Sequence, residues 1–149
     1  LYDHGIVPEE EPFKKVVHQG MITCDGTKMS KSKGNAVSPD DFDQDELRMY
    51  LMFIGPYSEG GEWDDSNIVG IKRFLNRMRT WLNNPDGDDE IDIDSFQKTV
   101  DGYVQDMKFN KVISTLMTFY NKNKSKIINA DNKTIIVDIL NCFAPSFER

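Results

Sequence analysis

The stretch Lys28-Met29-Ser30-Lys31-Ser32-Lys33-Gly34-Asn35 places three lysines and two serines within six positions and ends on Gly-Asn. Asp25-Gly26 before it is typical of a tight turn, and Ser38-Pro39 after it favours extended backbone, so we predict that the stretch forms a loop. A lysine ammonium on a flexible stem can follow phosphate oxygens while charge develops on them. The pattern therefore indicates a loop that binds polyphosphate.

The alternative is a solvated basic turn, which is the commoner explanation for a loop with several lysines. The order of the residues favours the first interpretation. The string KMSKS arises by chance only on the order of once in ten thousand chains of this length, and the Lys-Gly-Asn extension lowers that frequency further. We therefore treat the stretch as a functional motif.

The string KMSKS followed by Lys-Gly-Asn resembles the second signature of class I aminoacyl-tRNA synthetases, most closely those for leucine, isoleucine, valine and methionine. The flanks resemble the leucyl-tRNA synthetases, with Pro12-Phe13-Lys14-Lys15 and Gln19-Gly20-Met21 before the signature. Later landmarks keep the order of that family, and they lie at residues 47–53, 55–56, 62–63, 70, 73–77, 109–110 and 143–145. The resemblance covers nearly the whole chain.

This resemblance implies a leucine–tRNA ligase, in which leucine and ATP give leucyl-adenylate and pyrophosphate before leucine passes to tRNA(Leu). It implies that Lys31 is catalytic and stabilises the departing pyrophosphate. The implied ATP-binding residues are Lys28, Met29, Ser30, Lys31 and Ser32. Mg²⁺ is expected to accompany ATP, and no metal site is expected in the chain itself. The implied partners are tRNA(Leu), ATP and leucine, and the implied enzyme is a monomer.

The family holds the adenine of ATP with a HIGH-type signature, and this sequence has no such run around its two histidines, His4 and His18. We therefore expect residues 1–149 to be a fragment that does not activate leucine by itself. Residues 39–48 also lack the Gly-Ala-Asp of the family, either because the chain is shorter there or because residues are missing from the sequence. Two alternatives stay open: a fragment of an isoleucyl-, valyl- or methionyl-tRNA synthetase, and a non-catalytic RNA- or protein-binding module derived from a synthetase.

The apolar periodicity predicts a mainly α chain with strands only near its start. The run from Val16 to Ile22 reads as a strand, and a helix follows the N-cap candidates Asp43 and Asp45 until Gly55-Pro56. Further helices are predicted from Ser66 to about residue 83, from about residue 95, from near residue 110 and after residue 131. We expect a small α/β unit carrying the KMSKS loop, followed by an up-and-down helical bundle.

The resemblance identifies residues 1–65 as the C-terminal part of a catalytic domain and residues 66–149 as a helical anticodon-binding domain. The apolar stripes of the helices are expected to form the core, and Trp63 and Trp81 are expected to pack in it rather than stack on bases. The stripes comprise Ile68, Ile71, Phe74, Leu75, Met78, Leu82, Phe96, Val100, Tyr103, Val104, Met107, Val112, Leu116, Phe119, Tyr120, Ile135, Ile136, Ile139, Leu140 and Phe143.

The net charge of −7 argues against a nucleic-acid partner, because affinity for phosphate backbones rests on Lys and Arg. The acids concentrate in residues 86–94, however, and a separate group of lysines spans residues 108–126. Charge alone leaves that group undecided between a solvated helix face and an RNA-facing one, and the resemblance favours RNA. The sequence shows neither a signal peptide nor an apolar run that could span a bilayer, so we expect a cytoplasmic protein without a membrane partner.

Overall fold

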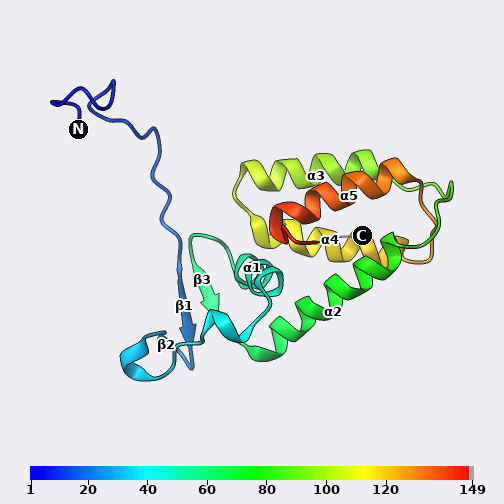
Figure 1. The fold of residues 1–149 in the computed structure, drawn as a ribbon, viewed down its shortest axis with the longest axis horizontal. Coiled ribbons are helices and arrows are strands. Elements are labelled where there is room, and N and C mark those ends of the chain that lie inside the picture. The colour runs from blue at the N-terminus through cyan, green and yellow to red at the C-terminus, as the bar shows by residue number, and fades with distance from the viewer. Residues whose placement is uncertain (148–149) are drawn as a thin grey trace.

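The computed structural model describes residues 1–147, which form a small sheet and five α-helices. The strands are β1 (Met21–Cys24), β2 (Thr27–Lys28) and β3 (Gly60–Glu62), and they lie in the order β2-β1-β3. Residues 148–149, the end of the predicted second domain, lie outside the described residues. Figure 1 shows the chain before β1 leading away from the rest of the fold, with a hydrogen-bonded turn at residues 1–6 and a long extended stretch between that turn and β1.

The turn between β1 and β2 confirms the tight turn predicted from Asp25-Gly26. Cys24 pairs with Thr27 in an antiparallel ladder, so the turn has two residues. Asp25 has φ 52° and Gly26 has φ 69°, and two-residue hairpins of this kind need positive φ at both positions. The turn therefore fixes where the chain enters the KMSKS stretch.

β1 and β3 are parallel, so the chain must cross over between them. The helix α1 (Gln44–Phe53) lies in that crossover. Gly60 has φ 79°, and a Cβ there would collide with the main chain of Met21, its partner in the ladder. A glycine is thus required where β3 begins against β1.

Four helices follow the sheet: α2 (Asp65–Leu82), α3 (Ile93–Gln105), α4 (Phe109–Asn123) and α5 (Ala130–Phe143). Figure 1 shows α3, α4 and α5 grouped together, with α2 crossing beside them and α1 between the sheet and these helices. The contacts agree, because α3 packs on α4 and α1 packs on α2, α4 and α5. α1 therefore connects the sheet to the helical part of the molecule.

Side-chain caps explain where α1, α2, α3 and α5 begin, whereas α4 has none. The carboxylate of Asp43 accepts hydrogen bonds from the backbone N–H groups of Asp45 and Glu46, which confirms Asp43 as the cap of α1. The predicted cap of α2, Ser66, is wrong by two residues. Asp64 holds that position, and its carboxylate accepts a 2.7 Å hydrogen bond from the Ser66 N–H.

The predicted core is largely confirmed, and both tryptophans are buried within it. Trp63 meets the ring of Tyr50 edge to face at 4.9 Å, and the Trp81 indole N–H donates to the carbonyl of Lys126. Val104 is an exception, because 43% of it is exposed near the end of α3. The stripe predicted for that helix extends too far, since only Phe96 and Val100 of α3 are fully buried.

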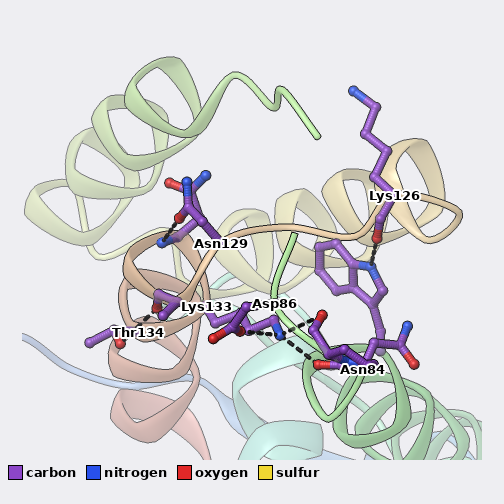
Figure 2. Close-up of polar contacts among 10 residues, drawn as sticks. Asn84, Asp86, Lys126, Asn129, Lys133 and Thr134 are labelled. Atoms are coloured by element: carbon purple, nitrogen blue, oxygen red, sulfur yellow. Dashed lines mark hydrogen bonds and ion pairs between the residues drawn. The ribbon is translucent and has the colours of Figure 1, made fainter. Parts of the chain in front are cut away.

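Lys133 on α5 is 2% exposed and was not predicted to be buried. Its ammonium donates to the carbonyls of Asn84 and Pro85, at 2.6 and 3.3 Å, and to the carboxylate of Asp86 at 2.7 Å. Figure 2 shows the Lys133 side chain reaching from the helix to Asn84 and Asp86. Lys133 thus holds the connection between α2 and α3 against the first turn of α5.

Candidate functional site

The KMSKS stretch forms a loop that projects beyond the β1–β2 hairpin. Met29 is half-buried and packs against the hydrophobic core. The following residues Lys31–Lys33 form a single 3₁₀ turn, which ends at Gly34 with φ 70°. The side chains of Lys31 and Lys33 are exposed on this turn, so the backbone anchors the loop while its ammonium groups face solvent.

Asn35 bridges the two ends of the loop. Its amide oxygen accepts a 2.9 Å hydrogen bond from the N–H of Ser30, and its amide nitrogen donates to the Thr27 hydroxyl at 3.0 Å. The same nitrogen lies 3.4 Å from the Lys28 carbonyl. The side chain of Asn35, at the end of the loop, therefore contacts Thr27, Lys28 and Ser30 at its start.

The hydroxyls of Ser30 and Ser32 lie 2.8 Å apart and form a hydrogen bond across the 3₁₀ turn. Each hydroxyl has further donor and acceptor capacity. Exposed ammonium groups and hydroxyls on one small turn can bind phosphate oxygens, whereas the loop offers no general base or nucleophile. The chemistry that this arrangement supports is electrostatic stabilisation.

Glu62 on β3 fixes the hairpin on the other side. Its carboxylate accepts hydrogen bonds from the Thr23 hydroxyl and from the N–H of Gly26, the latter at 2.9 Å. The hydrogen bond from Thr23 contributes most, and with the one from Gly26 it holds the pKa of Glu62 below its usual value. The neighbouring thiol of Cys24 has a raised pKa, chiefly because of desolvation and then because of nearby carboxylates.

Lys28 ends strand β2, and Met29, Ser30, Lys31 and Ser32 follow it directly in the loop, although Met29 faces the core rather than solvent. The sequence identified Gly34-Asn35 as the end of the motif, but it did not predict that the Asn35 side chain would close the loop. The sequence likewise indicated Glu62 only as one residue of the family resemblance, without predicting its contact with the hairpin. The available signal was the short spacing from Thr27 to Asn35, which places a second polar side chain within reach of the loop base.

A groove of about 280 Å³ lies between α2 and α4, and we call it the α2–α4 groove. Phe74 and Tyr120 line it, and their rings meet edge to face at 6.2 Å. Asn67, Arg77 and Asn121 also line it. A groove lined by aromatic rings and polar side chains suits a partner that carries both flat rings and charged groups.

The charges of the helical part are distributed unevenly. Residues 66–85 carry four basic residues and no acid, and residues 107–130 carry five lysines and no acid, whereas residues 86–106 carry eight acids and one lysine. Within residues 1–147, neither Arg73 nor Arg77 on α2 forms an ion pair, nor does Lys124 at the end of α4. The basic charge thus belongs to α2 and α4 and the acidic charge to α3 and the connection before it.

Among the described residues, no cluster of three or more His, Cys, Asp or Glu side chains is arranged to hold a metal ion. No helix in residues 1–147 combines the length and the hydropathy needed to cross a membrane.

The model of one protein family, tRNA synthetases class I (I, L, M and V), matches residues 6–94 of this chain. The leucine–tRNA ligase of Clostridium tetani is 43% identical over 89% of the chain, and that of Malacoplasma penetrans is 37% identical over 97% of it. The chain spans only about a fifth of the length of these relatives, 19% and 20% respectively.

A solved structure gives the same picture at the level of the fold. The crystal structure of the ternary complex of Agrobacterium radiobacter K84 agnB2 LeuRS, tRNA and LeuAMS superposes with a TM-score of 0.76. That match covers 97% of this chain and 23% of the LeuRS chain, at 26% sequence identity. The likeness therefore extends over both the sheet and the helices that follow.

Proposed function

Because this chain belongs to the class I tRNA synthetases for isoleucine, leucine, methionine and valine, we propose that it is part of a leucine–tRNA ligase. The enzyme activates leucine with ATP to leucyl-adenylate and then transfers leucine to tRNA(Leu). The relatives with 43% and 37% identity, both leucine–tRNA ligases, favour leucine among the four amino acids of the family. The segment described here contributes the ATP-binding loop and tRNA-binding helices.

The observation that carries this proposal is the braced loop with exposed Lys31 and Lys33. In leucine activation, a carboxylate oxygen of leucine bonds to the α-phosphorus of ATP while the bond from that phosphorus to the bridging oxygen breaks. Negative charge then grows on the departing pyrophosphate. Lys31 stabilises this charge, and a loop whose backbone is already fixed does so without reorganisation during the reaction.

The other loop residues have supporting roles in this proposal. Lys28, Ser30 and Ser32 orient the loop or contact phosphate oxygens, and Met29 anchors the loop in the core. Mg²⁺ enters as part of the ATP substrate. The lysine and serine side chains of the loop do not form the set of carboxylate oxygens that Mg²⁺ sites in proteins use, so we derive no step through it.

The tRNA-binding part of the proposal rests on α2 and α4. A phosphate backbone binds where Lys and Arg are concentrated, and beyond Asp65 at the start of α2 these two helices carry basic residues and no acids. The α2–α4 groove lies between them, and Arg77 lines it. Residues 1–65 then correspond to the end of the catalytic domain and residues 66–149 to the anticodon-binding domain, with tRNA meeting the basic side of the helices.

Amino-acid-dependent exchange of pyrophosphate into ATP tests the assignment to leucine. The full-length protein that carries this segment is assayed with leucine, isoleucine, valine and methionine in parallel. We expect exchange to depend on leucine with at least a tenfold preference over the other three. A preference for one of the other amino acids would identify the rival synthetase, and no exchange with any of them would favour a non-catalytic binding module.

Binding of tRNA(Leu) to the 149-residue chain at several salt concentrations tests the assignment of the basic helices. Replacing Arg73 and Arg77 by Ala should weaken binding and reduce the slope of log affinity against log salt by about one unit per lost phosphate contact. Lys98→Ala on the acidic helix α3 is the matched control, and it should leave both quantities unchanged. An equal loss in the control would place the RNA elsewhere.

A further inference from the structure

We infer that Asn35 is a positioning residue for leucine activation, which acts through Lys31 without contacting the substrate itself. The inference rests on the proposed function of the loop. Asn35 is half-buried, whereas Lys31 is exposed on the 3₁₀ turn four residues earlier. The geometry separates the two tasks, since one side chain holds the loop and the other presents charge.

The hydrogen bonds of Asn35 close the loop at its base. The Ser30 N–H, which directly precedes the 3₁₀ turn, has the amide oxygen of Asn35 as its acceptor at 2.9 Å. The amide nitrogen reaches the Thr27 hydroxyl, which in turn donates to the carbonyl of Cys24 at 3.2 Å. Asn35 therefore ties the turn that carries Lys31 to the β1–β2 hairpin.

The hairpin itself is fixed independently of Asn35. Glu62 on β3 accepts the Gly26 N–H at 2.9 Å and also the Thr23 hydroxyl. Removing Asn35 should consequently leave the hairpin in place and free only the segment from Ser30 to Gly34. Lys31 would then sample many positions, and the reaction would lose the benefit of a charge that is already in place.

The test is a double-mutant cycle on the rate of adenylate formation in the full-length protein that carries this segment. Lys31→Ala, Asn35→Ala and the double variant are compared by pre-steady-state kinetics. We expect Asn35→Ala to slow adenylate formation on the order of tenfold with an intact Lys31, and less than about twofold in the Lys31→Ala background. The dissociation constant for ATP should change little.

Amide hydrogen exchange on the 149-residue chain supplies a readout that does not depend on activity. Asn35→Ala should accelerate exchange at the Ser30 N–H and leave the Gly26 N–H, held by Glu62, as the internal control. Thr27→Val is a milder second variant, because it removes one acceptor of the Asn35 amide nitrogen and the hydrogen bond from the Thr27 hydroxyl to the Cys24 carbonyl but leaves the Ser30 N–H its acceptor. It should slow adenylate formation in the same direction by a smaller factor.

The outcomes separate this inference from the proposed function. If Lys31→Ala leaves adenylate formation unchanged, the proposed role of the loop is wrong and this inference falls with it. If Lys31→Ala slows the reaction but Asn35→Ala has no effect, or has the same effect in both backgrounds, only the positioning role is overturned. A loss that disappears in the Lys31→Ala background supports it.

Discussion

Lys133 illustrates, at the scale of single residues, what a sequence does not disclose. The sequence places it between Asn132 and Thr134 near the start of α5, where a lysine would ordinarily extend to solvent. Its acceptors, the carbonyls of Asn84 and Pro85, lie 49 and 48 residues away in the chain. Nothing in the local pattern indicates that these carbonyls would be turned towards the helix, so burial of this ammonium could not have been predicted.

Lys133→Met keeps the aliphatic stem but removes all three hydrogen bonds. We expect the free energy of unfolding to fall by about 1–3 kcal/mol, because the carbonyls of Asn84 and Pro85 and the carboxylate of Asp86 lose a charged hydrogen-bond donor. Chemical denaturation of the 149-residue chain measures this. Asp86→Asn is the matched control, and its effect should stay below about 1 kcal/mol because the Asp86 side chain is 63% exposed. Equal losses in both variants would mean that the carboxylate, not the carbonyls, holds Lys133.

The element that links the two parts of the molecule is α1. Its position was predictable, because Asp43 is a good N-cap and Gly55-Pro56 is a strong stop, and both signals are local. The long-range contact of α1 could not be predicted from the sequence. Asp45 is 4% exposed, and its carboxylate accepts a 3.1 Å hydrogen bond from the N–H of Ser146, which lies 101 positions away. Arg48, on the same helix, donates to the carbonyl of Cys142.

Asp45→Ala should therefore uncouple the first turn of α1 from the turn that follows α5. We expect a loss of about 1–3 kcal/mol in the free energy of unfolding, because the Ser146 N–H loses the charged acceptor that the buried Asp45 supplies. Asp41→Ala, an exposed carboxylate just before the helix, should change stability by less than about 0.5 kcal/mol. An Asp45→Ala variant as stable as the unmodified chain would show that this hydrogen bond contributes nothing net.

The sheet shows the limits of prediction at the scale of the whole molecule. The apolar run from Val16 was expected to be a strand, but β1 begins at Met21. β3 offers partners only for Met21, Ile22 and Thr23, so residues 16–20 continue as extended chain without a ladder. A β-strand needs a neighbouring strand to pair with as well as an apolar residue pattern, and the sequence of one strand does not show how long its neighbour is.

The loop was predictable in most respects, because its turn, its lysines and its closing glycine are all local features. The contact that fixes the hairpin below the loop was not predictable, since Glu62 reaches Gly26 from a strand 36 residues further along the chain. The helices were predictable where an apolar stripe faces a full set of neighbours, as in α2. The prediction failed at Val104, where the stripe continues in sequence but leaves the core in space.

The central claim is that the loop serves the departure of pyrophosphate through Lys31, and pre-steady-state adenylate formation in the full-length protein tests it most directly. Lys31→Ala should slow this step roughly a hundredfold or more, about 3 kcal/mol, while ATP affinity falls far less. Lys33→Ala, on the same turn, is the matched control and should have a smaller effect. Equal losses in the two variants, or a Lys31→Ala defect confined to the dissociation constant for ATP, would contradict the account.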